Sequence, residues 1–177
     1  TMIGLRFAGG QEPSAETVKA VSGAEVAAIW KAETGVDAEV KPNKLAIVLS
    51  IPTAEAHIRK SVILSECIGD PVALRCSVIE FLWRYELPTS EKASLVRGSL
   101  STRSFLSVAQ YSNAVLVRRL DNISEGVTQG HLVKIAHRFA AETACGDGWV
   151  KAEFGEGPTF VGPPPITDAP HQDGCAG

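Results

Sequence analysis

Hydroxyl and guanidinium side chains gather in one short segment, which reads RGSLSTRS. We expect a Gly-started turn that leads into a helix whose N-cap is Ser101 or Thr102. Free backbone amides and the positive end of the helix dipole favour a phosphate at such a place. Arg97 and Arg103 would supply charge, and Ser99 and Ser101 would donate hydrogen bonds. An ordinary capped helix with solvated arginines is the alternative interpretation.

Four more basic residues follow in the same part of the chain. Arg118 and Arg119 come near the end of the helix predicted from residue 102, where cations suit the negative end of the dipole. Lys134 and Arg138 lie four residues apart on the next predicted helix, so they share one face. Each pair can be a solvated helix face, or it can extend the phosphate site into a groove.

Signatures of catalysis or metal binding are absent from the sequence. It contains no GxSxG, HExxH, GxxxxGK[ST] or GxGxxG motif. His131 and His137 are six residues apart and fall on different faces of a helix, which argues against a metal site. Asp147, Glu153 and Glu156 are acidic neighbours without the spacing of a calcium loop. We therefore predict a protein that is not an enzyme and that has no cofactor or metal.

Charge is partitioned unevenly along the chain. Residues 1–91 hold 9 Lys/Arg against 12 Asp/Glu, residues 92–138 hold 7 against 2, and residues 139–177 hold 1 against 6. The formal net charge of −3 therefore hides a basic middle between two acidic ends. Such a chain suits binding to a polyanion, or association with copies of itself.

The sequence predicts mostly helices, and these helices would carry the basic residues described above. Ser22 and Glu25 have the spacing of a capping box, and Gly35 is a natural helix end. Leu74, Val78, Leu82 and Tyr85 recur one helical turn apart. Residues 44–51 are rich in β-branched and apolar side chains and predict a strand or an apolar connector. Further helices are expected over the following ranges: 53–68, 71–87, 90–98, 102–120 and 131–144.

We thus predict a mainly α fold, a bundle-like helical domain of five or six helices with one or two short strands. The domain would span residues 14–145. Residues 1–13 would form an N-terminal strand or arm, and the Gly- and Pro-rich residues 146–177 a C-terminal arm. The three tryptophans, Trp30, Trp83 and Trp149, are expected to be packing anchors.

The remaining features concern the compartment. No apolar run approaches the length of a membrane span, and the N-terminus lacks the layout of a secretory signal. The four cysteines form no CxxC pair and are expected to be reduced thiols. These features predict a cytoplasmic protein that does not enter a membrane.

Three short blocks of the sequence are residues 28–31 (AIWK), residues 99–103 (SLSTR) and residues 137–142 (HRFAAE). Together they resemble the coat proteins of flexible filamentous plant viruses, and the resemblance implies a virion as the alternative location to the cytoplasm. The aromatic run that follows the last block in that family is absent here. The resemblance implies a helical domain with extended arms that pack on neighbouring subunits. It also implies that RNA lies in a groove of the protein and is bound with little base specificity.

Our leading hypothesis is therefore a non-enzymatic structural subunit of a symmetric assembly, possibly a helical coat protein. It would contact copies of itself through its terminal arms and bind single-stranded RNA through its basic middle. The first alternative is a protein-binding accessory subunit of a larger complex without nucleic acid. The second is a small helical enzyme with an unrecognised site.

Overall fold

The protein has a mixed fold of helices and antiparallel strands, which the computed structural model describes for residues 17–43, 45–70 and 72–155. The helices are α1 (Gly23–Thr34), α2 (Ser90–Ser101) and α3 (Gln129–Glu153). The strands are β1 (Thr17–Val18), β2 (Glu39–Pro42), β3 (Ile47–Ile51), β4 (Ile58–Ile68), β5 (Arg75–Glu86), β6 (Ser107–Tyr111), β7 (Ala114–Asn122) and β8 (Val127–Thr128). The predicted mainly α, bundle-like fold is therefore wrong.

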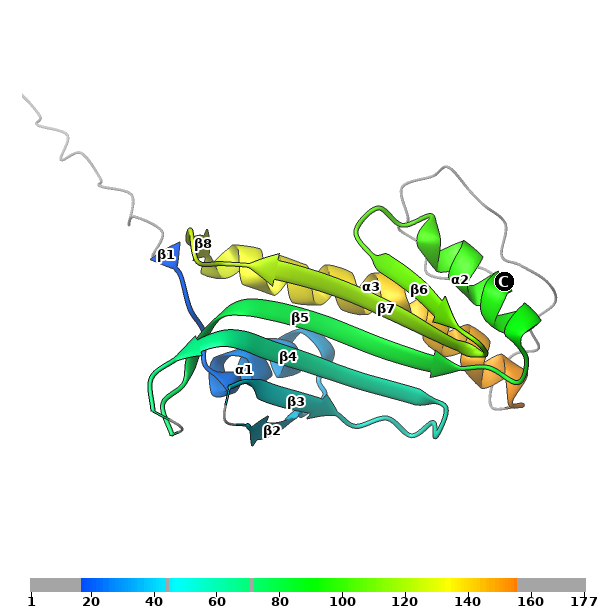
Figure 1. Cartoon of the computed structure of the whole chain (residues 1–177), viewed down its shortest axis with the longest axis horizontal. Helices are drawn as coiled ribbons and strands as arrows, with labels where there is room; N and C mark the ends of the chain where they lie inside the picture. The colour runs from blue at the N-terminus through cyan, green and yellow to red at the C-terminus, as the bar shows by residue number, and fades with distance from the viewer. Residues whose placement is uncertain (1–16, 44, 71, 156–177) are drawn as a thin grey trace, which may run out of the picture.

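A six-stranded sheet forms the centre of the molecule. Its strand order is β2-β3-β4-β5-β7-β6, and every neighbouring pair is antiparallel. The long hairpin of β4 and β5 runs along the whole length of the sheet (Figure 1). β1 and β8 form a separate two-stranded sheet at one end.

Helices α1 and α3 cover one face of this sheet, and Figure 1 shows them on its far side. Phe139 of α3 packs against two aromatic rings of β5, with centroids 5.1 Å from Phe81 and 4.6 Å from Trp83. Trp30 of α1 contacts the same Trp83 ring at 5.5 Å. Large aromatic side chains gain most from removal from water, so this layer holds the core. We call this side of the sheet the covered face.

Three of the predicted helices are confirmed at their starts. Ser22 and Glu25 make the capping box of α1, and Gly35 follows it with a φ of 74°. Thr89 caps α2. The helix expected from residue 131 is α3, which starts at Gln129 and continues through Glu153, beyond the expected end at residue 144. Capping depends on residues only three or four positions apart, so it indicates a helix end independently of the tertiary structure.

The helices expected over residues 53–68, 71–87 and 102–120 are wrong, because those residues form β4, β5, β6 and β7. In β5 the one-turn spacing of apolar residues coincides with a second pattern of period two. Ile79, Phe81, Trp83 and Tyr85 alternate with partly exposed or exposed residues, and all four are buried. β-branched and aromatic residues at alternate positions favour a strand. The strand prediction for residues 44–51 is confirmed by β3 over Ile47–Ile51.

Two further expectations concern the cysteines and tryptophans. Cys67 and Cys76 lie directly opposite each other on β4 and β5 and form a disulfide, so the expectation of reduced thiols is wrong for this pair. Trp30, Trp83 and Trp149 are all buried, which confirms their packing role.

The ends of the chain belong only partly to the described structure. Residues 1–13, expected as an N-terminal arm, lie outside the described residues, and so do residues 156–177 of the expected C-terminal arm. Among the helices that are described, none is long and apolar enough to cross a membrane.

Candidate functional site

The segment expected to cradle a phosphate lies at the wrong end of a helix. Ser101 is the last residue of α2, so the RGSLSTRS segment contains a helix C-terminus and not an N-terminus. The Ser101 hydroxyl donates to the Arg97 carbonyl at 2.7 Å, and the Thr102 hydroxyl donates to the Ser99 carbonyl at 2.8 Å. Carbonyls and the negative end of the dipole repel an anion. The helix N-terminus predicted at these residues is therefore wrong, and the predicted phosphate site loses that basis.

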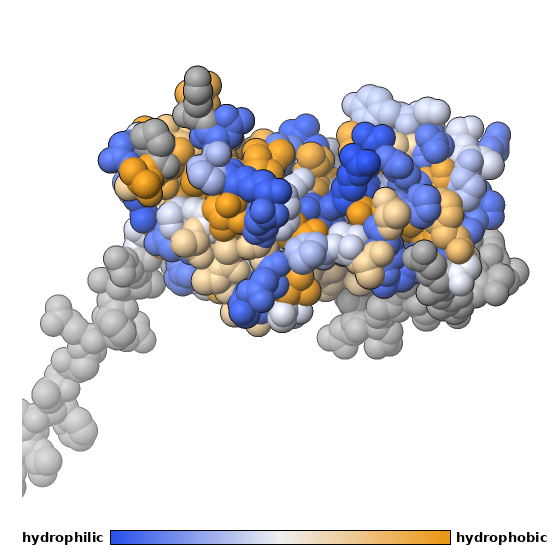
Figure 2. All heavy atoms as spheres, turned by 90° about the horizontal axis from the view of Figure 1, so that it is seen from below, coloured by the Kyte–Doolittle hydropathy of each residue, from blue (hydrophilic) through white to orange (hydrophobic). Residues whose placement is uncertain are grey.

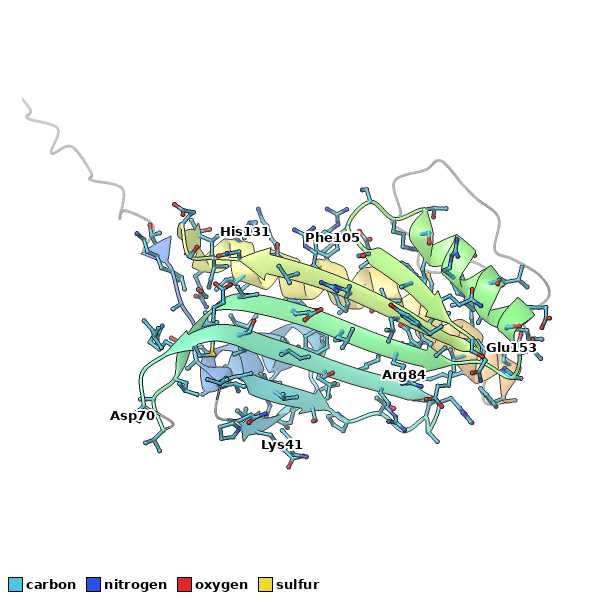
Figure 3. The ribbon with its side chains drawn as sticks, in the orientation of Figure 1. Lys41, Asp70, Arg84, Phe105, His131 and Glu153 are labelled. Atoms are coloured by element: carbon cyan, nitrogen blue, oxygen red, sulfur yellow. A yellow bond between two sulfur atoms is a disulfide. The ribbon has the colours of Figure 1, made fainter. Side chains whose placement is uncertain are left out.

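Two of the predicted cations do come together, on the covered face. The guanidinium carbon of Arg119 on β7 lies 4.5 Å from the centre of the Phe105 ring, and that of Arg138 on α3 lies 4.3 Å from it. Phe105 is buried, so the ring and the two guanidinium groups join strand to helix. Figure 3 labels Phe105 at this junction.

Each of these arginines already has a carboxylate partner on its own element. Arg119 makes a bidentate pair with Asp121 at 2.6 and 2.8 Å, and the Asp121 hydrogen bond raises the pKa of the guanidinium. Arg138 donates to Glu142 at 2.6 Å. Because both charges are neutralised locally, they stabilise the contact between strand and helix and leave little charge for a polyanion.

Arg103 contributes to the same region of α3. Its Nη2 lies 3.3 Å from the sulfur of Cys145, and the side chain is half-buried. Cys145 follows Glu142 by three residues, so both lie on the side of α3 that also carries Arg138. Three of the predicted cations therefore meet at this helix as packing residues.

The other predicted cations lie on different surfaces. Arg118 is next to Arg119 on β7 and therefore points to the opposite face of the sheet, where it pairs with Glu80 at 3.1 Å. Arg97 is exposed on α2, and Lys134 is exposed on α3. The basic residues of the middle segment thus form no common groove across the described chain, which removes the geometric basis for a nucleic-acid site.

Histidines do not form a metal site either. His137 on α3 lies 3.1 Å from Glu33 of α1 and joins the two covering helices. The backbone N–H of His131 donates to the Thr128 hydroxyl that caps α3. The part of the chain that the structure describes contains no cluster of three metal-ligating side chains.

A buried polar cluster that the sequence did not indicate fixes the C-terminal half of α3 to the sheet. The Tyr85 hydroxyl lies 3.0 Å from both Asp147 Oδ1 and the Thr143 carbonyl. Lys60 of β4 forms an ion pair with the other oxygen of Asp147. Burial, with the nearby Asp147 charge, raises the pKa of Tyr85 well above its ordinary value. A neutral phenol that is fully buried against its partners is suited to packing and not to proton transfer.

The opposite face of the sheet is different, because no described helix covers it (Figure 1). Alternation along the strands places one set of side chains on this side. We call this surface the open face and define it by these residues: Val48, Ser50, Arg59, Ser61, Ile63, Glu80, Leu82, Arg84, Leu116, Arg118 and Leu120. Sequence reasoning missed it because three of its four strands were expected to be helices.

Apolar side chains alternate with charged ones across the open face. Val48 lies opposite Ile63, Leu82 lies opposite Arg118, and Leu116 and Leu120 flank Arg118 along β7. The registers put Ile63 and Leu82 on adjacent strands within diagonal reach. All the apolar members keep some exposed surface, and Leu120 is 46% exposed. Apolar side chains interleaved with the Glu80–Arg118 ion pair suit a protein interface, which combines apolar contacts with polar ones.

Other exposed apolar side chains are scattered. Val40, Leu45 and Val72 lie at the edge strand or at hairpin ends, away from the centre of the open face. On the side of the molecule that Figure 2 shows, hydrophobic residues occur in separate groups among hydrophilic ones. Isolated exposed apolar residues are normal, so the open face is the stronger candidate.

Comparisons with known proteins add no assignment. No family model, no curated protein and no solved structure matches the chain. The resemblance to filamentous coat proteins stays a prediction, and the helical fold that it implied is wrong.

Proposed function

We propose that the protein is a non-enzymatic, protein-binding subunit of a larger complex, and that its partner docks on the open face. The single observation that carries this proposal is the asymmetry of the sheet. Helices cover one face, while the other presents apolar side chains across β3, β4, β5 and β7, interleaved with the Glu80–Arg118 ion pair and bordered by Arg59 and Arg84.

Physical chemistry favours a covering layer on such a face. An antiparallel sheet can leave one face in water, but removing apolar side chains on that face from water is still favourable. Leu82, Leu116 and Leu120 gain that burial only when another surface covers them. The charged residues around them, including Arg118 with Glu80, would give the interface its orientation more than its affinity.

Nucleic acid is less well supported as the partner. The guanidinium groups of Arg118, Arg119 and Arg138 are paired with carboxylates and divided between two faces. Binding to a phosphate backbone needs several cations that can reach successive phosphates on one surface. Catalysis is also poorly supported. In the buried polar cluster around Tyr85, the Tyr85 hydroxyl and Lys60 are both paired with Asp147 and not directed at a ligand site.

The test uses the full chain with a photo-crosslinking residue at position 82, in cells of the source organism. A captured protein is identified, purified and titrated against the wild type and against Leu82→Glu by calorimetry. We expect Leu82→Glu to weaken binding by at least about tenfold. Leu95→Glu on α2, which changes a leucine that is 41% exposed, is the matched control and should bind as the wild type does.

Three results count against the proposal. One is equal loss of binding in both variants, and another is the absence of any partner that binds when purified. The third is tight, strongly salt-dependent binding of a single-stranded RNA oligonucleotide that is lost in Arg97→Glu. That result would favour the nucleic-acid hypothesis.

A further inference from the structure

Two arginines lie directly opposite each other on the open face. Arg59 of β4 is the register partner of Arg84 of β5, and both are exposed. Like charges at directly opposite positions destabilise a pair of strands. Arg84 has an ion pair with Glu86 at 3.0 Å, while Arg59 has no ion pair within the described part of the chain. The arrangement therefore has one cation more than its own acids neutralise.

The surrounding charges leave the open face positive. Among its defined residues, Arg59, Arg84 and Arg118 stand against Glu80, and with Glu86 at the end of β5, which pairs with Arg84, one positive charge stays in excess. The whole chain, in contrast, carries a formal charge of −3. A positive spot on an acidic protein selects partners with carboxylates at the matching place.

Leucines border the arginine pair. Arg84 lies opposite Leu116 of β7, and Leu82 precedes Arg84 by two residues on the same face. Figure 3 labels Arg84 near the end of β5. A ligand that reaches the two arginines would therefore also contact apolar side chains.

Resting on the proposed function, we infer that the open face binds an amphipathic helix of a partner protein, with its apolar stripe on Leu82 and Leu116 and carboxylates toward Arg59 and Arg84. Helices α1 and α3 already pack on the other side of these strands, so the sheet accommodates a helix, and a helix with one apolar stripe can contact the leucines and the arginines together. Carboxylates one helical turn apart lie about 5–6 Å from each other. Neighbouring strands lie about 4.8 Å apart, so two such carboxylates match the arginine pair.

The experiment uses two synthetic helical peptides with the same leucine stripe, one flanked by glutamates and one by lysines. Their binding to the full chain is measured by fluorescence anisotropy. We expect the glutamate peptide to bind at least about tenfold more tightly. The double variant Arg59→Glu/Arg84→Glu should reverse this preference. Lys134→Glu on α3, which lies on the other side of the sheet, is the matched charge control and should keep it.

Circular dichroism of the double variant shows whether it folds, and the single variant Arg59→Gln provides a second reading if it does not. Loss of the glutamate preference in Arg59→Gln supports the inference. Equal binding of both peptides, lost in Leu82→Glu, would overturn the inference and leave the proposed function standing. Binding of neither peptide overturns the inference as well, while the titration of the captured partner decides the proposed function separately.

Discussion

The two faces of the central sheet are formed by the same strands, but described helices cover only one of them. On the covered face, Phe81, Trp83 and Tyr85 are buried against α1 and α3 and form the core. On the open face, the intervening residues Leu82 and Arg84 of the same strand keep exposed surface. A single strand therefore carries a folding surface on its odd positions and a candidate binding surface on its even positions.

The same comparison shows which polar side chains stabilise the fold and which are exposed to a binding partner. Arg119 on the covered face is held between Asp121 and the Phe105 ring. Arg118, its neighbour in sequence, points to solvent and pairs with Glu80. Two adjacent arginines thus have different roles because a strand alternates its side chains between faces. Although the two arginines are adjacent in the sequence, they do not form one basic surface in the structure.

The largest expected effect would come from truncating the core on the covered face. Phe139→Ala removes a ring that is fully buried between Phe81 and Trp83 and leaves a cavity. We expect the free energy of unfolding to fall by about 3–5 kcal/mol, measured by urea denaturation. Leu82→Ala on the open face should change it by less than about 1 kcal/mol. Similar losses in both variants would contradict the contrast between the faces.

The sequence predicted the helices of this fold better than its strands, for a physical reason. Caps are local: Ser22 with Glu25, Gly35 and Thr89 mark helix ends through bonds to backbone groups three or four residues away. Strand partners are distant, and Ile58 pairs with Tyr85 across the long hairpin. In a segment with apolar residues at many positions, periods of two and of 3.6 residues coincide, so the partner strand decides between them.

The candidate site was less predictable than the fold. The amino-acid composition showed that the middle segment is basic. It did not show that carboxylates from other strands pair with these residues, as Glu80 of β5 does with Arg118. The cluster of Tyr85, Asp147 and Lys60 joins three elements and has no signature along the chain. The open face depends entirely on strand register, which a single sequence does not reveal.

A smaller effect, still of more than about 1 kcal/mol, would come from crowding the contact between α3 and the sheet. A Cβ at Gly146 would lie 2.7 Å from the Tyr85 ring, which is fixed by its bonds to Thr143 and Asp147. We expect Gly146→Ala to lower the free energy of unfolding by about 1–3 kcal/mol. Thermal denaturation monitored by circular dichroism measures this loss.

Gly148 on the same helix provides the matched control. A Cβ there would meet nothing within 4 Å, so Gly148→Ala should be neutral or stabilise the helix by up to about 1 kcal/mol. If both alanine variants stabilised the protein equally, the close approach of α3 to Tyr85 would be contradicted. The pair therefore separates helix propensity from packing on the covered face.

The smallest effect concerns the start of α1, at the rim of the covering layer. Burial raises the pKa of the Glu25 carboxyl, but hydrogen bonds from Ser22 and the Arg75 charge outweigh it, and the net pKa is lowered. A lowered pKa in the folded state means stability that is present above the ordinary carboxyl value of 4.5 and lost as the pH falls through the folded value. The carboxyl is half exposed and screened by water, so the effect is small.

Glu25→Gln should therefore cost about 0.5 kcal/mol at neutral pH, and the difference from the wild type should vanish in acid. Urea denaturation at a series of pH values measures both quantities. Ser22→Ala removes one of the hydrogen bonds that lower the Glu25 pKa, so its acid loss should be smaller and should be complete at a higher pH than in the wild type. A Glu25→Gln variant whose deficit grew on acidification would show that the carboxylate does not stabilise this helix start. The covering helix would then depend on its contacts with the sheet and with α3, through Trp30 against the aromatic rings of β5 and Glu33 against His137.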